Sequence, residues 1–149
     1  VVGDIKKLDL SKNKKLKVLA VTAELKKLNI LKNKKLEVLE LNTPNLKKID
    51  ISKNKKLKNI SVTAPVRQMN LAGCKNLRTL SIKTNLTGLN IAGNNALKYL
   101  TIDAPLDNID ISALTALKNM TLTHVKIHEF NPMNTHLSNL YLNNCEIAT

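Results

Sequence analysis

Apolar residues recur along the whole chain in triplets of the form L-x-x-L-x-L, in which another apolar residue can replace Leu. The distance from one triplet to the next alternates between about 11 and about 9–10 residues, so two triplets make a unit of 20–21 residues that repeats about seven times. Self-similarity at such a period predicts a fold in which one small unit stacks on the next. The triplets begin at Ile5, Leu16, Leu25, Leu36, Leu46, Leu57, Val66, Leu77, Leu86, Leu97, Leu106, Leu117, Ile127 and Leu137.

Within each triplet, the last two apolar residues enclose one polar residue, as in "LDL" at 8–10 and "LTI" at 100–102. A period of two predicts a short strand with one buried face. The segments between triplets are too short for helices, and Pro44, Pro65 and Pro105 would interrupt several of them. We therefore expect each coil to stack on the previous one with strands about 4.8 Å apart, which buries leucines that a single coil leaves exposed.

The two halves of the unit end in different turns. The first half reads L-x-x-L-[DN]-[LI] and runs into a turn such as "SKNKK", whereas the second half ends in a tighter turn such as "VTAP". An Asn in the first turn can pair with backbone groups of neighbouring coils that burial would otherwise leave without a partner. Both cysteines are expected to be small buried residues of this column, too far apart for a disulfide within the chain. The predicted structural ladder comprises Asn13, Asn33, Asn54, Cys74, Asn94 and Cys145.

The 20–21-residue unit, with "LDLSKNKKLKVL" and an Asn or Cys at the turn, resembles bacterial leucine-rich repeats of the internalin-like kind over about residues 5–147. The resemblance implies a mostly β, right-handed leucine-rich-repeat solenoid of about seven coils, with short parallel strands and little or no helix. We expect a single domain, 1–149, with an irregular last coil at about 123–149. Unlike the family pattern, the second half-units lack a Cys at the strand centre. By resemblance they form the concave sheet, with strands near 19–21, 39–41, 60–62, 80–82, 100–102, 120–122 and 140–142.

The same resemblance implies a non-enzymatic binding module of a bacterial cell-surface or secreted protein, although no signal is visible in this chain. The sequence carries no G-x-S-x-G, no H-E-x-x-H and no glycine-rich phosphate loop, so neither an activity nor a cofactor is expected. We expect a monomer that does not insert into membranes and that binds a protein or a glycan. Alternatives are a rigid spacer within a larger surface protein and an electrostatic binder of acidic polymers. The residues expected to bind a partner on the concave face are Lys17, Glu37, Glu40, Lys58, Arg78, Lys98 and Tyr141.

Charge is distributed unevenly along the chain, whose formal net charge is +13. Residues 1–75 hold 19 Lys and Arg against 6 Asp and Glu, whereas residues 76–149 hold 5 of each. The surplus is concentrated in "SKNKKLK", "LKNKKLE" and a second "SKNKKLK", which read either as an anion-binding edge or as a solvated edge that keeps the protein soluble. Nucleic acid is an unlikely partner, because Arg67 and Arg78 are the only arginines and aromatic residues are few. The possible anion edge comprises Lys12, Lys14, Lys15, Lys32, Lys34, Lys35, Lys53, Lys55 and Lys56.

Two groups of possible metal ligands stand out, and neither predicts a metal site. The polar residues of the first-half triplets form a column whose side chains should point parallel rather than converge on one calcium ion. The three histidines lie within "THVKIHEFNPMNTH" at 123–136, where Pro132 interrupts the repeat, but stacking should place His128 and His136 on different sides of a coil. The Asp/Asn column comprises Asp9, Asn29, Asp50, Asn70, Asn90 and Asp110.

Overall fold

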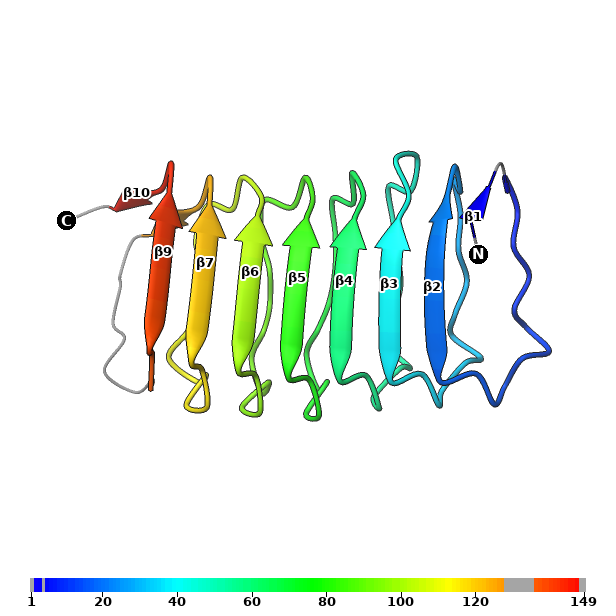
Figure 1. Ribbon diagram of the computed structural model, residues 1–149, viewed down its shortest axis with the longest axis horizontal. Helices are drawn as coiled ribbons and strands as arrows, with labels where there is room; N and C mark the ends of the chain where they lie inside the picture. The colour runs from blue at the N-terminus through cyan, green and yellow to red at the C-terminus, as the bar shows by residue number, and fades with distance from the viewer. Residues whose placement is uncertain (1, 4, 128–135, 148–149) are drawn as a thin grey trace.

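The computed structural model describes residues 2–3, 5–127 and 136–147 as a solenoid built around one parallel sheet. Its eight strands lie side by side in the order β1-β2-β3-β4-β5-β6-β7-β9 and point the same way (Figure 1). A separate two-stranded sheet pairs β10 with β8. The strands are β1 (Val2–Gly3), β2 (Val18–Ala23), β3 (Val38–Asn42), β4 (Asn59–Thr63), β5 (Thr79–Lys83), β6 (Tyr99–Asp103), β7 (Asn119–Thr123), β8 (Lys126–Ile127), β9 (Asn139–Asn143) and β10 (Glu146–Ile147).

The seven longer strands of the large sheet come from the second half-units, as predicted. Their side chains alternate between the core and solvent: in β4, Ile60 and Val62 are buried and Ser61 between them is exposed. The parallel register preserves this alternation from coil to coil, since Ile60 pairs with Leu80 and Ser61 pairs with Ser81. Seven strands are connected by six turns of the solenoid, which agrees with the predicted number of coils.

The first half-units run along the back of the solenoid and, among the described residues, form no regular strand apart from the two-residue β8, which contains Ile127. The prediction that their triplets are strands too is wrong for the six that the structure describes in full, because in each of these an Asp or Asn side chain accepts a hydrogen bond from the backbone N–H two residues ahead. In the third coil, for example, Oδ1 of Asp50 accepts a hydrogen bond from the backbone N–H of Ser52 at 2.8 Å. Apart from the short β8–β10 pair, pairing on the back across the described residues is limited to one isolated bridge, between Asn70 and Asn90, and to scattered single hydrogen bonds.

A single apolar core runs through the stack between the sheet and the back. Both half-units contribute to it: Leu36 and Leu57 enter from the residues before the strands, and Leu46 and Ile51 enter from the back, each with at most 1% of its surface exposed. Burial decreases at the last coil, where Leu140 of β9 is 41% exposed. No described segment forms a helix long and apolar enough to span a membrane.

Candidate binding surfaces

Apart from Glu40 and Tyr141, the outward face of the sheet is lined along its centre by short side chains. Register places one residue of each strand in this central column, because side chains two apart on a strand share a face. The result is a smooth strip with a shallow hollow of about 280 Å³ over β2–β4. Two of the predicted binding residues, Glu40 and Tyr141, lie near its two ends. The central column comprises Ala20, Glu40, Ser61, Ser81, Thr101, Thr121 and Tyr141.

The other predicted binding residues form a row along one margin of the sheet, just before the strands begin. Backbone hydrogen bonds join successive members, such as Lys98 N–H to the Arg78 carbonyl at 2.9 Å. Glu37 is the one acidic member, and its carboxylate lies 2.6 Å from Lys58 Nζ and 3.8 Å from Lys17 Nζ. The hydrogen bond from Lys58 lowers the pKa of Glu37. The marginal row comprises Lys17, Glu37, Lys58, Arg78, Lys98, Lys118 and Ser138.

The lysine-rich turns lie on the same edge of the solenoid as the marginal row, because each turn leads directly into the following strand. Every lysine of the predicted anion edge is exposed. Lys55 folds over the neighbouring coil, where its Nζ donates to the Ala72 carbonyl at 2.8 Å. In the place of Lys53, the next two coils have Gly73 and Gly93 with φ of +78° and +77°. These two turns use the left-handed conformation that glycine tolerates, so the turn changes type where its lysines end.

An asparagine column holds these turns together inside the solenoid. Asn33 Nδ2 donates to the carbonyls of Leu10 and Asn13, at 3.0 and 2.8 Å. Asn54 Nδ2 donates to the carbonyls of Ile30 and Asn33, at 3.0 and 2.9 Å. Both bridge to the coil before, and Asn94 likewise reaches the Leu71 carbonyl at 3.3 Å.

Of the remaining three residues of the predicted ladder, Cys74 lies in the column as predicted, whereas Asn13 is exposed and Cys145 lies elsewhere. Asn13 belongs to the first turn and its side chain is exposed. Cys74 is in the column and only 1% exposed, and burial raises the pKa of its thiol. Cys145 lies outside the column, at the opposite turn, because its triplet is a second half-unit whose turn follows the strand. There its Sγ donates to the Leu122 carbonyl at 3.4 Å, and both cysteines are free thiols.

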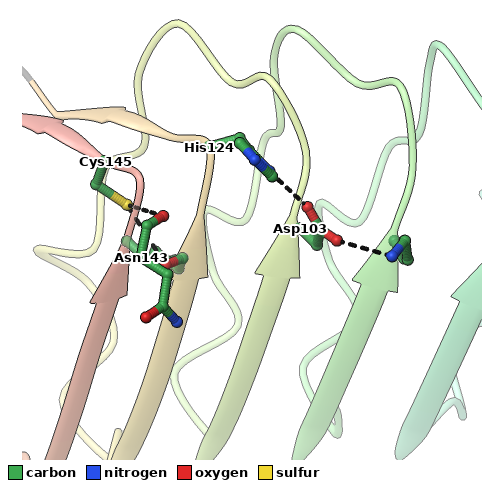
Figure 2. A network of polar contacts seen from close by, with 6 residues as sticks. Asp103, His124, Asn143 and Cys145 are labelled. Carbon is green, nitrogen blue, oxygen red and sulfur yellow. Dashed lines mark hydrogen bonds and ion pairs between the residues drawn. The ribbon is translucent and has the colours of Figure 1, made fainter.

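The opposite edge of the sheet, after the strands end, has a small polar cluster that the sequence analysis missed. Asp103 Oδ1 lies 2.9 Å from His124 Nδ1, and Asp103 Oδ2 lies 3.3 Å from Lys83 Nζ (Figure 2). The hydrogen bond with His124 is the main cause of the lowered pKa of Asp103. Asn143 and Cys145 lie nearby in the last coil, as Figure 2 shows. Each partner sits in an adjacent coil, so the cluster ties three coils together.

The structure gives the residues considered as possible metal ligands other roles. His136 Nδ1 lies 3.0 Å from the Thr115 carbonyl, away from His124, whereas His128 and Pro132 are outside the described residues. On the back, each Oδ1 atom of the Asp/Asn column accepts a hydrogen bond from the backbone N–H two residues ahead. A hollow of about 840 Å³ there is lined by Asp50, Asn70 and neighbouring side chains. Within the part of the chain that the structure describes, no three His, Cys, Asp or Glu side chains are placed to hold a metal ion.

Solved structures similar to this one include internalins of Listeria monocytogenes. The functional domain of InlJ, which includes a cysteine ladder, matches with a TM-score of 0.90 and 27% sequence identity over 97% of this chain and 33% of that chain. The internalin InlF matches with a TM-score of 0.81 and 18% identity over 99% of this chain and 47% of that one. This chain therefore spans about a third of the length of the InlJ chain and about half of the length of the InlF chain. No family model and no curated protein matches the sequence.

Taken with the repeat and its register, these likenesses show that the chain folds as a leucine-rich-repeat solenoid similar to those of the internalins. It differs from InlJ in one respect that bears on the core. InlJ includes a cysteine ladder, whereas the two cysteines here lie at opposite turns. In this chain the buried polar column is built from Asn33, Asn54 and Asn94.

Proposed function

We propose that this chain is a non-enzymatic binding module of a bacterial surface or secreted protein, and that a protein partner lies across the outward face of its sheet. The observation that carries the proposal is the central column, in which Ser61, Ser81, Thr101 and Thr121 follow one another in register. Four short hydroxylated side chains in a row leave a strip on which another surface can approach the sheet closely. The internalin-like fold supports an interaction module of this kind.

Side chains in and beside the strip provide the aromatic rings and charges that a specific interface needs. Tyr99 and Tyr141 are 46% and 58% exposed, and tyrosine is among the residues that contribute most to protein interfaces. Glu40 within the strip and the marginal row beside it carry charges of both signs, and charges at the rim of an interface set its orientation and association rate. The strip itself contributes close backbone approach and hydrogen bonds from hydroxyl groups.

The proposal is tested by blocking the strip with long side chains. The double variant Ser81→Arg/Thr101→Arg adds two bulky residues to the central column, and Gln68→Arg/Asn108→Arg adds the same charge on the back, where both native residues are exposed. We expect partners selected from a panel of purified extracellular proteins to lose at least tenfold in affinity for the first variant and to bind the second normally. If only the back variant lost affinity for these partners, the assignment of binding to the outward face of the sheet would be contradicted. A chain that binds none of the panel would fit the alternative of a rigid spacer.

A further inference from the structure

In the second half of the chain, the cations that pair with acidic groups lie at one edge of the sheet, and the cations without such a partner lie at the other edge. The net charge of zero does not reveal this separation. That half has as many acidic as basic residues. Lys83 pairs with Asp103 at 3.3 Å, and Lys126 pairs with Glu146 at 4.0 Å. Lys83 and Asp103 are the last residues of β5 and β6, and Lys126 and Glu146 lie in β8 and β10, after the long strands have ended. The three remaining cations, for which no acidic group lies within 4 Å among the described residues, are Arg78, Lys98 and Lys118.

These three cations extend the lysine edge of the first coils along the solenoid. They belong to the marginal row, in which Lys58, Arg78, Lys98 and Lys118 occupy four consecutive coils and are joined by backbone hydrogen bonds of 2.8–2.9 Å. Their Cα atoms are therefore one strand spacing apart, about 4.8 Å. In the earlier coils, the lysine-rich turns lie on this edge. Positive charge thus passes from the turns to the margin of the sheet without a break.

We propose that this edge binds a linear acidic polysaccharide that lies along the solenoid, across the coils. The edge is separate from the central column, so the proposal goes beyond the protein-binding function above. Cations about 5 Å apart repel one another in the free protein, and a chain of anionic groups running parallel to them relieves this repulsion and releases its own counterions. Glu37, the one acidic member of the row, is already neutralised by Lys17 and Lys58, so it leaves no free negative charge to interrupt the edge.

The side chains beside the edge favour a sugar polymer over other polyanions. Hydroxyl and amide groups of Asn59, Thr79 and Asn119 lie next to the marginal row, and they can pair with the hydroxyl groups that every sugar unit carries. A single-stranded nucleic acid calls for aromatic platforms on which bases stack, and Tyr99 alone is available along this part of the sheet. An anionic membrane favours a surface that also inserts apolar side chains, whereas the leucines of the lysine turns are half-buried (Leu16, Leu31) or buried (Leu36, Leu57).

Two matched variants and one direct measurement test this proposal. Arg78→Gln/Lys98→Gln/Lys118→Gln removes three charges from the edge, and the control Lys26→Gln/Lys27→Gln/Lys47→Gln removes three from the exposed back. With a size-fractionated heparin oligosaccharide as the probe, we expect at least a tenfold weaker Kd for the edge variant and at most a twofold change for the control. The slope of log K against log salt should decrease by about 2 in the edge variant, by analogy with about 0.7 per contact for single-stranded polyanions.

Footprinting supplies a readout that requires no variant: heparin should protect Lys98 and Lys118, but not Lys26 or Lys27, from acylation. Equal loss of affinity in both triple variants would overturn the proposal, as would the absence of heparin binding at low salt. Binding of poly(dT) as tightly as heparin, at the same lysines, would overturn the choice of a polysaccharide. Thr101→Arg should leave heparin binding intact, so the protein-binding face and this edge can fail independently.

Discussion

Two identical stretches of sequence allow the contribution of stacking to be measured separately from local turn preference. "SKNKKLK" occurs at 11–17 and at 52–58, so Asn13 and Asn54 have the same neighbours along the chain. Asn13 is exposed at the first turn. Asn54 is fully buried, and its amide donates to the carbonyls of Ile30 and Asn33 in the preceding coil. Replacing either Asn with Ala changes the turn propensity equally, and only at position 54 does it remove contacts between coils.

The magnitude follows from the two hydrogen bonds that Asn54→Ala removes. Each contributes a net stabilisation of about 0.5–1.5 kcal/mol, which makes the loss about 1–3 kcal/mol. The small cavity left by the amide adds to this cost. Loss of the buried Oδ1, which has no hydrogen-bond partner among the described residues, offsets part of it. We therefore expect Asn54→Ala to lower the free energy of unfolding by about 2 kcal/mol, and Asn13→Ala to change it by less than about 0.5 kcal/mol, as is usual at exposed positions.

Urea denaturation followed by far-ultraviolet circular dichroism measures both values, because the chain has no Trp for fluorescence. The m values of the two variants and the native protein must agree, so that a difference in midpoint reports stability rather than a change in cooperativity. Equal destabilisation by the two substitutions would refute the reasoning, since it would show that the Asn acts through its own turn. A loss below about 0.5 kcal/mol for Asn54→Ala would refute it too.

Three further predictions concern single side chains. Thr43 is fully buried and its Oγ1 has no hydrogen-bond partner among the described residues, so Thr43→Val should raise the free energy of unfolding by about 1 kcal/mol in the same urea assay; a loss of stability would show that the hydroxyl is paired. A thiol reagent should modify the partly exposed Cys145 at least tenfold faster than Cys74, whose pKa is raised by burial, and mass spectrometry of the early product would expose the reverse order. The hydrogen bonds from Ser112 lower the pKa of Asp110, so its contribution to stability is present above the unfolded-state pKa of about 4 and is lost as pH falls through the lower folded-state value. Asp110→Asn should keep this turn and remove its pH dependence, making the variant relatively more stable at pH 3 than at pH 7 in urea titrations; a constant difference between the two pH values would count against this.

The sequence was sufficient to predict the strands of the second half-units, because alternation of apolar and polar residues is a local property that stacking leaves unchanged. Ile60, Ser61 and Val62 read the same way in the sequence and in the sheet. The triplets on the back have the same alternation and are not strands. There the Asp50 side chain accepts a hydrogen bond from the backbone N–H of Ser52, which in a strand would pair with a neighbouring coil. The apolar pattern does not reveal which of these two hydrogen bonds forms.

The surfaces were less predictable, because they depend on which residues stacking brings to one edge. Counting charges along the chain assigns the surplus to the first half, whereas register shows that Lys98 and Lys118 continue the same edge. The contact between Asp103 and His124 joins adjacent coils at a turn where His124 adopts a positive φ of 60°. Asn144, at the same position of the next coil, also has a positive φ, of 49°, and the apolar triplets do not predict this conformation. Cys145 was misplaced because its triplet was assigned the turn of the other half-unit.

The central claim is that the second half-units form one continuous parallel sheet that displays both proposed binding surfaces. Spin labels attached to Cys introduced at Thr22 and Thr123, with Cys74 and Cys145 replaced by Ala, test it by pulsed electron paramagnetic resonance. Register places these two positions in one column five strands apart, which corresponds to about 24 Å along the sheet. A continuous sheet predicts a single narrow distance distribution near that value. A broad distribution, or one centred well away from about 24 Å, would contradict it.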